Sequence, residues 1–454
     1  MNIYSVGRRY GGWLGLVAAL VLIHLAVLAE STVSSSLDIL ARQAGADDPK
    51  EAAAACQALR EAGPAGMQAL VEVYADAVAQ HRQSHGPGNA APPDAAWSRV
   101  YAAFDAVGQQ RDDYAAQLYW HTNLDEAIAA ARASGKPILS LRLLGKLNEE
   151  YSCANSRFFR TTLYPNAEVS AYLRDHFILH WQSVRPVPRI TIDMGDGRKI
   201  ERTITGNSIH YILDSEGRPV DALPGLYGAR AFLDGLGRAR AAARQSAALA
   251  EPERTQFLQQ YHATELARVE QDWEQDLARL GGQGVNGRPA GLNAPDGTLS
   301  EASRLEAATS EESWRQIAFR HAEQGPLDPA VMALILAKQP ANRPAETPDM
   351  ADAMRLTVSK MAVETPMMRM IRNLKHSIAE DTVRNEYERH ARLHEWFAQG
   401  RVPTSLDALN ARVYAEIFLT PMTDPWLGLA PADIYSALDR GGLVQNNSTT
   451  INQP

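Results

Sequence analysis

The sequence predicts an α/β core between two mainly helical regions. Residues 118–245 alternate short apolar strands with amphipathic helices, the pattern of a central mixed sheet with helices on both faces. Residues 36–108 and 251–440 lack such strands and show the apolar spacing of helices. With 454 residues the chain is long enough for two or three domains of ordinary size. We therefore expect a central α/β domain with helical regions before and after it.

The N-terminus has the features of an export signal. Arg8 and Arg9 precede an apolar run over residues 12–28, and small or compact residues end the run near Ala29. Two interpretations stay open. Residues 1–29 are a cleaved signal peptide, or residues 12–28 are retained as a membrane anchor, a length at the short end for spanning a bilayer. Either way the remainder is expected outside the cytoplasm, in the periplasm, and in the second case anchored to the inner membrane.

The first helical region, residues 36–108, is rich in alanine. Its apolar spacing predicts a helical hairpin with a break at Gly63-Pro64-Ala65-Gly66. A stretch rich in glycine and proline, residues 86–93, predicts a linker, and a further helix is expected over residues 94–108.

The central region, residues 118–245, predicts a definite series of elements. Asn123 is placed to cap a helix over residues 125–133, and the strand 138–144 is almost continuously apolar, as expected at the centre of a sheet. The series continues with helices over 155–163 and 168–176, a strand over 177–181, a hairpin turning at Asp196-Gly197, a strand over 209–213, and a closing helix over 230–242.

The C-terminal region, residues 251–440, is expected to be almost entirely helical. A long charged helix over 251–280 leads through a Gly/Asn/Pro-rich loop to shorter helices. Six methionines gather between Met350 and Met370, where they fill the helical core, line an adaptable groove or bind copper(I) through their soft sulfur atoms. The polar end, residues 441–454, is expected to be disordered.

The net charge and the number of cysteines exclude several classes of function. The net charge is −8 and no basic block is present, which argues against a nucleic-acid partner. Cys56 and Cys153 are the only cysteines, which excludes a disulfide framework and a cysteine-based zinc site. We expect no cofactor and no metal. In an oxidising compartment the two cysteines could still pair with each other.

The segment Ser134-Gly135-Lys136-Pro137, the strand after it and Cys153 at the start of a new helix form the most informative motif. Together with the later elements, this order resembles the thioredoxin-like superfamily, most closely its exported members, over residues 118–245. The resemblance implies that Cys153 stands at the nucleophilic cysteine. It also implies that Ser156 replaces the resolving cysteine and that Ser208 stands at the usual cis-proline. The motif is then Cys-x-x-Ser, which cannot close its own disulfide.

The environment expected for Cys153 can also be argued from its residues alone. A helix N-terminus favours the thiolate, Arg157 adds positive charge, and Ser156 could donate a hydrogen bond to the sulfur. Glu149 and Glu150 favour the neutral thiol instead. Cys153 and Ser156 are therefore the candidate catalytic residues, with a small buried hydrophobe in an inactive site as the alternative.

Other polar residues are expected around this thiol. The candidates for substrate binding are Asn155, Arg157, Asn207, Ser208 and His210. His180 and His210 are expected on neighbouring strands, where a histidine near a thiolate could act as a base, although packing is the plainer role. His390 and His394 have the spacing of a metal pair on one helix face, but no nearby residue completes the set, and the segment looks like a solvated face.

Two functions follow from these expectations. The first is an exported thioredoxin-fold protein whose single thiol at Cys153 has a redox or thiol-binding role with protein thiols as partners. The second is a non-enzymatic scaffold of the cell envelope that binds a protein partner through a degenerate thioredoxin fold.

Overall fold

The computed structural model describes residues 35–84, 94–203, 206–279, 311–323, 326–338, 370–427 and 437. The apolar segment 12–28, the methionine-rich segment up to residue 369 and the polar end 441–454 lie outside these residues, so the expectations about them stay predictions. The chain divides into two compact units, residues 1–402 and 403–454. In the second unit, Ser405 caps helix α16 (Leu406–Glu416). All elements below belong to the first unit.

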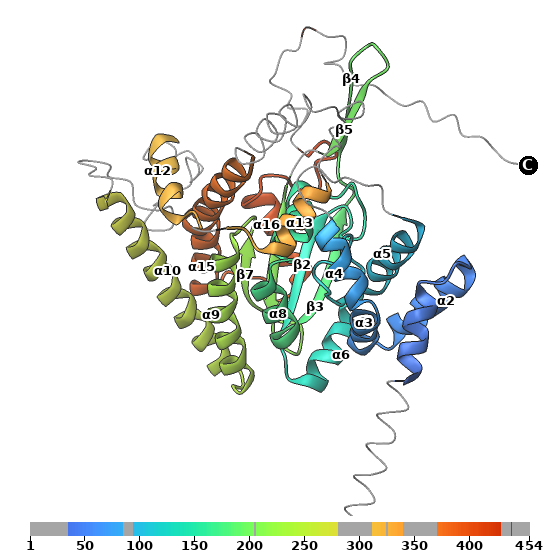
Figure 1. Cartoon of the computed structure of the whole chain (residues 1–454). Helices are drawn as coiled ribbons and strands as arrows, with labels where there is room; N and C mark the ends of the chain where they lie inside the picture. The colour runs from blue at the N-terminus through green and yellow to red at the C-terminus, as the bar shows by residue number, and fades with distance from the viewer. Residues whose placement is uncertain are drawn as a thin grey trace, which may run out of the picture. The chain divides into compact units, whose positions relative to one another are not determined.

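A five-stranded mixed sheet lies at the centre of the first unit (Figure 1). Its order is β1 (Trp120–His121), β3 (Ile178–Arg185), β2 (Ile138–Leu144), β6 (Ser208–Leu213) and β7 (Pro219–Pro224). The strands β1, β3 and β2 are parallel, and β6 and β7 run antiparallel to their neighbours. The predicted α/β core is thereby confirmed.

The apolar character of β2, β6 and β7 follows from their burial. Every residue of these three strands is buried, because neighbouring elements cover both faces of the sheet. The strand predicted over 138–144 coincides with β2. It is preceded by α6 (Leu124–Ser134), which Asn123 caps as predicted and which ends at Gly135 in the left-handed conformation (φ 69°) that favours glycine.

The helical segment after β2 is more irregular than predicted. Cys153 caps a short helix, α7 (Ala154–Phe158), which passes directly into a π-helical turn, η1 (Phe159–Leu163). Pro165 follows, and Asn166 then caps α8 (Ala167–His176). The predicted single helix over 155–163 is therefore divided, and single π turns of this kind often accompany functional sites.

The predicted hairpin forms a separate two-stranded sheet between β3 and β6. Its strands β4 (Arg189–Asp193) and β5 (Lys199–Thr203) stand away from the central sheet (Figure 1). Ile192 pairs with Ile200, and both side chains are exposed, as is Met194 near the turn.

The strand β7 was not predicted. It begins at Pro219, ends at Pro224 and carries the buried Asp221 at its middle, so its sequence looks like a loop. Proline is tolerated there because β7 is an edge strand of the sheet. The missing prediction matters because β7 carries part of the buried polar cluster described below.

The N-terminal helices pack into their own apolar cluster. Residues 35–44 are helical, and α2 (Pro49–Glu61), α3 (Pro64–Val73), α4 (Ala75–Ser84) and α5 (Ala95–Gly108) follow. The predicted break at Gly63-Pro64 is confirmed, since Pro64 begins α3, and Asp94 caps α5.

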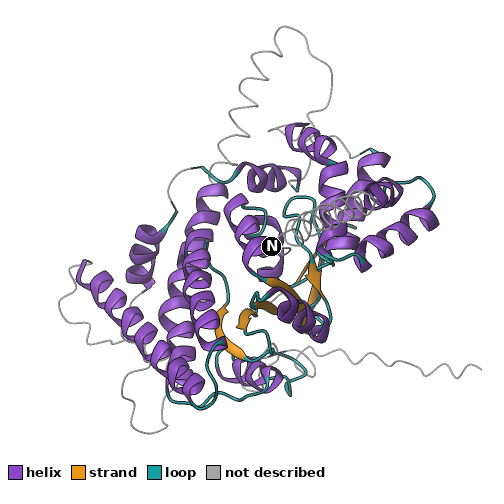
Figure 2. Cartoon of the chain, turned by 90° about the horizontal axis from the view of Figure 1, so that it is seen from below, coloured by secondary structure: helices purple, strands orange, loops and turns teal. Residues whose placement is uncertain are grey.

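The described residues that follow β7 in the first unit are mainly helical (Figure 2). After β7 come α9 (Ala229–Ala247), α10 (Glu253–Arg279), α12 (Glu311–His321), α13 (Pro329–Ala337), the π-helical segment η2 (Asn385–His390) and α15 (Ala391–Ala398). The long helix predicted over 251–280 is confirmed as α10, which packs against α15. Across the described ranges, no helix has both the length and the apolar character needed to cross a bilayer.

Candidate functional site

Cys153 lies where the sequence predicts, at the start of a helix. It is the N-cap residue of α7, and the backbone N–H of Ser156 points at its Sγ atom over 3.5 Å. Its side chain is fully buried, with 0% exposure. The hydroxyl of Ser156 donates to the carbonyl oxygen of Cys153 at 2.9 Å. The expected position is therefore present, but the sulfur has no open approach.

Burial decides the charge of this thiol. It raises the pKa of Cys153 above its usual value, and the hydrogen bonds from Ser156 only partly offset the effect. The thiol is therefore neutral near pH 7, and the expected stabilisation of the thiolate by the helix start is outweighed. The alternative of a small buried hydrophobe fits this environment better.

Arg157 holds the hairpin beside the thiol. Its guanidinium donates to the carbonyl oxygen of Ser152 at 3.0 Å and to the hydroxyl of Thr203 at the end of β5. The Thr203 hydroxyl in turn donates to the same Ser152 oxygen at 2.9 Å. The residue directly before Cys153 is thereby fixed to the last residue of the hairpin.

Gly206 and Ser208, at the entry to β6, also contact the start of α7, the helix that Cys153 caps. The Asn155 amide donates to the Ser208 hydroxyl at 3.0 Å, and both side chains are buried. Gly206 approaches so closely that an added Cβ atom would lie 2.4 Å from Asn155 Oδ1. The predicted contact of this segment with the thiol region is thus present for Gly206 and Ser208. Asn207 lies between them and is half-buried.

His210 faces aromatic rings instead of the thiol. Its Nε2 lies 2.7 Å from the Tyr164 hydroxyl, and its ring packs against Phe159. Burial lowers the pKa of His210 to about 3, so this histidine is neutral. The expectation that His180 and His210 lie on neighbouring strands is wrong, because β2 lies between β3 and β6. His180 instead contacts Ser140 of β2 at 2.8 Å.

The two cysteines are free thiols. Cys56 belongs to α2 and packs, partly buried, against the apolar cluster of the N-terminal helices. The alternative of a Cys56–Cys153 disulfide is therefore not realised in this structure.

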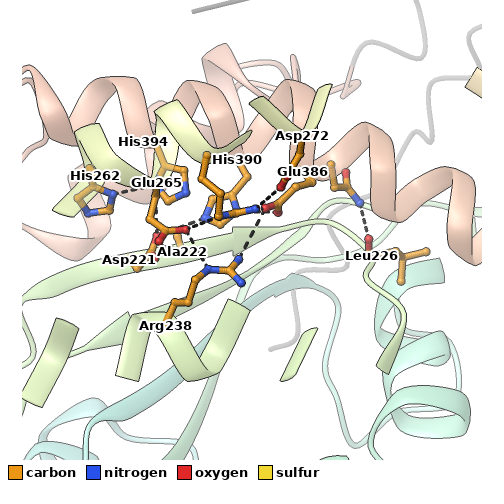
Figure 3. A network of polar contacts seen from close by, with 12 residues as sticks. Asp221, Ala222, Leu226, Arg238, His262, Glu265, Asp272, Glu386, His390 and His394 are labelled. Carbon is orange, nitrogen blue, oxygen red and sulfur yellow. Dashed lines mark hydrogen bonds and ion pairs between the residues drawn. The ribbon is translucent and has the colours of Figure 1, made fainter. Parts of the chain in front are cut away.

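A second polar cluster lies between the edge strand β7 and the helices α10, η2 and α15 (Figure 3). Asp221 comes from β7, His262 from α10, His390 from the end of η2 and His394 from α15, and all four side chains are buried. Buried charged and polar groups are expensive unless they are paired, so each contact in the cluster matters.

Asp221 accepts three hydrogen bonds inside this cluster. Its Oδ1 atom accepts from the backbone N–H of Ala222 at 2.8 Å and faces His390 Nε2 at 3.3 Å, while Oδ2 accepts from the Tyr261 hydroxyl at 2.7 Å. Burial alone would raise the pKa of this carboxyl, but the hydrogen bond from His390 and the charge of that imidazolium hold it well below its usual range. Asp221 is therefore a carboxylate.

His390 is the charged histidine of the cluster. Burial lowers its pKa, but the carboxylates of Glu386 and Asp221 outweigh burial and raise the pKa to about 9. Its Nδ1 lies 2.9 Å from Glu386 Oε2, and Glu386 in turn pairs with Arg268 of α10 at 2.7 Å. His390 thus donates from both ring nitrogens and links the two carboxylates.

His262 and His394 form an unusual pair. Their Nδ1 atoms lie 2.8 Å apart, and His262 Nε2 lies 2.8 Å from the backbone carbonyl of Val220. Burial lowers the pKa of both histidines, so both imidazoles are neutral. The buried His394 Nε2 has no hydrogen-bond partner among the described residues.

Sequence reasoning missed most of this cluster. The interpretation of the segment around His390 and His394 as a solvated face is wrong, because Tyr387 and both histidines are buried. One signal for His262 was present. It lies at helical spacing from Leu258, Glu265 and Val269, all on the buried face of α10. Asp221 gave no such signal, because β7 was not recognised.

Comparisons of this chain with models of known protein families, with curated proteins and with solved structures found no match. The function is therefore argued from the two sites themselves.

Proposed function

We propose that this protein is a non-enzymatic interaction protein of the cell envelope, built on a thioredoxin-like core. Two features support the thioredoxin-like assignment. The order of elements follows the resemblance, from α6 through Gly135-Lys136-Pro137 and β2 to a cysteine that opens α7. The central sheet is mixed, with helices packed against it. The export signal in the sequence supports the location.

The closed environment of Cys153 is the observation that carries the non-enzymatic assignment. Thiol–disulfide exchange needs a thiolate and access for the partner sulfur. Cys153 has 0% exposure, and burial raises the pKa of its thiol. Thr203 and Ser208 are hydrogen-bonded to Ser152 and Asn155 on either side of it. In this proposal Cys153 caps and packs α7, and no substrate reaches it.

The hairpin β4–β5 supplies the surface for a partner. Ile192, Met194 and Ile200 are 45%, 54% and 40% exposed, and Ile192 and Ile200 face the same side as a cross-strand pair. An isolated two-stranded hairpin with exposed apolar side chains gains stability when that face is covered. We assign this face to a protein partner of the envelope with a complementary apolar surface.

The monothiol function is the second candidate, because Cys153 caps a helix and receives the Ser156 N–H. In that case the Cys153 thiolate would attack a disulfide of a partner protein and form a mixed disulfide, releasing the partner's second sulfur as a thiolate. An external thiol would then resolve the mixed disulfide. This reaction requires the segment containing Thr203 and Ser208 to move away first.

Alkylation of Cys153 separates the two candidates. The measurement is the rate of alkylation of the folded chain against pH in a Cys56→Ser background, beside a matched sample in denaturant. If the protein is a non-enzymatic interaction protein, Cys153 of the folded chain is expected to be alkylated only as fast as the chain unfolds. Alkylation of the folded chain with an apparent pKa below about 8.5, the value for an unperturbed cysteine, would contradict the proposal and establish the monothiol function.

The partner face can be tested by placing a photo-crosslinking residue at Ile192, with Glu201 on the opposite face of the hairpin as the control position. In cells, the proposal expects one discrete adduct from Ile192 and none from Glu201. Equal adducts from both positions, or no adduct from either, would contradict the partner face. An adduct made of two copies of this chain would show that the face mediates self-association and does not bind a different protein.

A further inference from the structure

We propose that Asp221, His262 and His394 form a buried zinc site that joins β7 to α10 and α15. The three residues come from three different elements, and each offers one ligand atom within 4.8 Å of the other two. This inference is independent of the proposed interaction function, because none of the three residues belongs to the hairpin β4–β5.

The hydrogen-bonding pattern points to a cation between the two imidazoles. A backbone carbonyl only accepts, so the contact with Val220 places the proton of neutral His262 on Nε2 and leaves Nδ1 as a lone pair. His394 turns its own Nδ1 toward that lone pair at 2.8 Å. If the His394 proton were on Nε2, it would be buried without a partner. If it were on Nδ1, the Nε2 lone pair would be buried without one.

A metal ion changes the role of the two Nδ1 atoms and leaves His394 Nε2 without a partner among the described residues. With a cation between them, both Nδ1 lone pairs become ligands instead of sharing one proton. Histidine ligands typically donate the other ring N–H to a backbone carbonyl or carboxylate, which is the arrangement of His262 and Val220. His394 Nε2 then carries the proton of that ring.

The distances suit a small tetrahedral ion. Bonds of about 2.0–2.1 Å in tetrahedral geometry place ligand atoms about 3.3 Å apart. The separation of the two Nδ1 atoms is 2.8 Å, and that of His394 Nδ1 and Asp221 Oδ1 is 4.0 Å, so the observed values lie on either side of the required one. Tetrahedral binding therefore needs the two Nδ1 atoms to separate by about 0.5 Å and Asp221 Oδ1 to approach His394 Nδ1 by about 0.7 Å.

The surrounding residues hold the ligands in place. Asp221 and Val220 are consecutive on β7, and Tyr261 and His262 are consecutive on α10. The Tyr261 hydroxyl donates to Asp221 at 2.7 Å while His262 Nε2 donates to Val220 at 2.8 Å, so the two pairs interlock. His390 donates to Asp221 Oδ1, the oxygen that also faces His394 (Figure 3). Tyr261 and His390 are therefore positioning residues.

The ligand set and its burial favour zinc. Two imidazoles and one carboxylate are ligands that zinc and iron(II) both accept. An iron(II) site of this type leaves several coordination positions open for substrate, whereas zinc needs only one further ligand to complete a tetrahedron. Because the ligands here are 0–2% exposed, we assign zinc, held by three protein ligands and one water molecule.

Metal binding by the purified chain tests the site directly. After removal of metal with a chelator, the folded chain is titrated with Zn²⁺, and with Co²⁺ as a spectroscopic probe. We expect one equivalent of tightly bound Zn²⁺, a rise of several degrees in Tm, and the strong visible absorption of tetrahedral Co²⁺. Absence of both the binding and the Co²⁺ spectrum in the folded wild-type chain would overturn the proposal.

Variants assign the ligands. His262→Gln, His394→Gln and Asp221→Asn are each expected to weaken Zn²⁺ binding more than about a hundredfold, and Tyr261→Phe about tenfold to a hundredfold. His180→Gln removes a buried histidine elsewhere in the sheet and is the control, with unchanged binding expected. If a ligand variant fails to fold, Tyr261→Phe still tests the site. Unchanged binding in all folded variants would place the metal elsewhere and overturn the assignment.

Discussion

At the scale of single residues, burial and local charge decide which groups are ionised. Burial favours the uncharged form of Cys153, His180 and His210, and for His180 the charge of Arg142 adds to the effect. His390 is as deeply buried, yet two carboxylates face it and keep it charged. Glu386, the largest cause that raises the pKa of His390, stands four residues before it in the sequence, whereas the second carboxylate, Asp221, lies on a distant strand that was not predicted.

The pH dependence of stability should report the charge of His390. Its folded pKa of about 9 is raised above the unfolded value, so its stabilising effect is complete below about pH 6.5 and is lost as pH rises through 9. The free energy of unfolding of wild type minus that of His390→Gln, measured without metal, should fall by roughly 3 kcal/mol between pH 6 and 10.

His180→Gln provides the contrasting control. Burial lowers the pKa of His180 to about 3, so wild type should lose stability relative to this variant as pH falls below about 6.5. A difference for His390→Gln that does not change with pH would show that His390 is not charged in the folded chain.

Asn155 and Ser208 were candidates for substrate binding, but their contact predicts a structural role. The hydrogen bond between them is buried, so removing one partner leaves the other unsatisfied and should cost about 1–3 kcal/mol in the free energy of unfolding. Urea unfolding of Asn155→Ala, Ser208→Ala and the double variant should give a coupling energy of about 0.5–3 kcal/mol. A coupling near zero would contradict the bond.

At the scale of secondary-structure elements, strong local signals were predictable and context-dependent ones were not. The continuous apolar run of β2, the Asn123 cap and the long amphipathic α10 were each readable from the sequence. In contrast, β7 is bounded by Pro219 and Pro224 and carries a central aspartate, and only its pairing with β6 makes it a strand. Tertiary pairing overrode its local sequence.

Gly225 should be the most sensitive position at the end of β7. Its φ of +80° favours glycine, and an added Cβ atom would lie 2.5 Å from Asn385 Oδ1 of η2. Gly225→Ala should therefore lower the free energy of unfolding by roughly 2–4 kcal/mol, from backbone strain and crowding together.

Gly135→Ala is the matched control for Gly225. Gly135 has a φ of +69°, but no atom lies within 4 Å of an added Cβ, so only the backbone strain of about 1–2 kcal/mol is expected. Equal losses for the two variants, measured by urea unfolding, would show that the contact with Asn385 does not constrain β7.

At the scale of the whole molecule, stability is expected to be unevenly distributed within the first unit. The residues of β2, β6 and β7 are all buried, whereas Thr203 is the only buried residue of β4 and β5. Regions with few buried contacts open more readily than the core. Among the strands of the two sheets compared here, β4 and β5 are therefore the most available for a partner.

Hydrogen exchange should map this difference. Amides of β4 and β5 are expected to exchange much faster than those of β2 and β6, as measured by mass spectrometry on the isolated chain. Addition of the crosslinked partner, once isolated, should slow exchange in the hairpin first. Protection of the hairpin equal to that of β2 in the isolated chain would contradict its assignment as an open surface.

Both ends of the hairpin β4–β5 are hydrogen-bonded to the loop that precedes Cys153. On the side of β3, the Gly145 N–H donates to the carbonyl oxygen of Arg185 at 2.8 Å, and on the side of β5, the Thr203 hydroxyl donates to Ser152 at 2.9 Å. These two hydrogen bonds thus connect the hairpin to both ends of the loop 145–152, which leads into Cys153. A partner that displaces the hairpin would therefore pull on this loop as well as on β3 and β6, between which the hairpin lies in the chain.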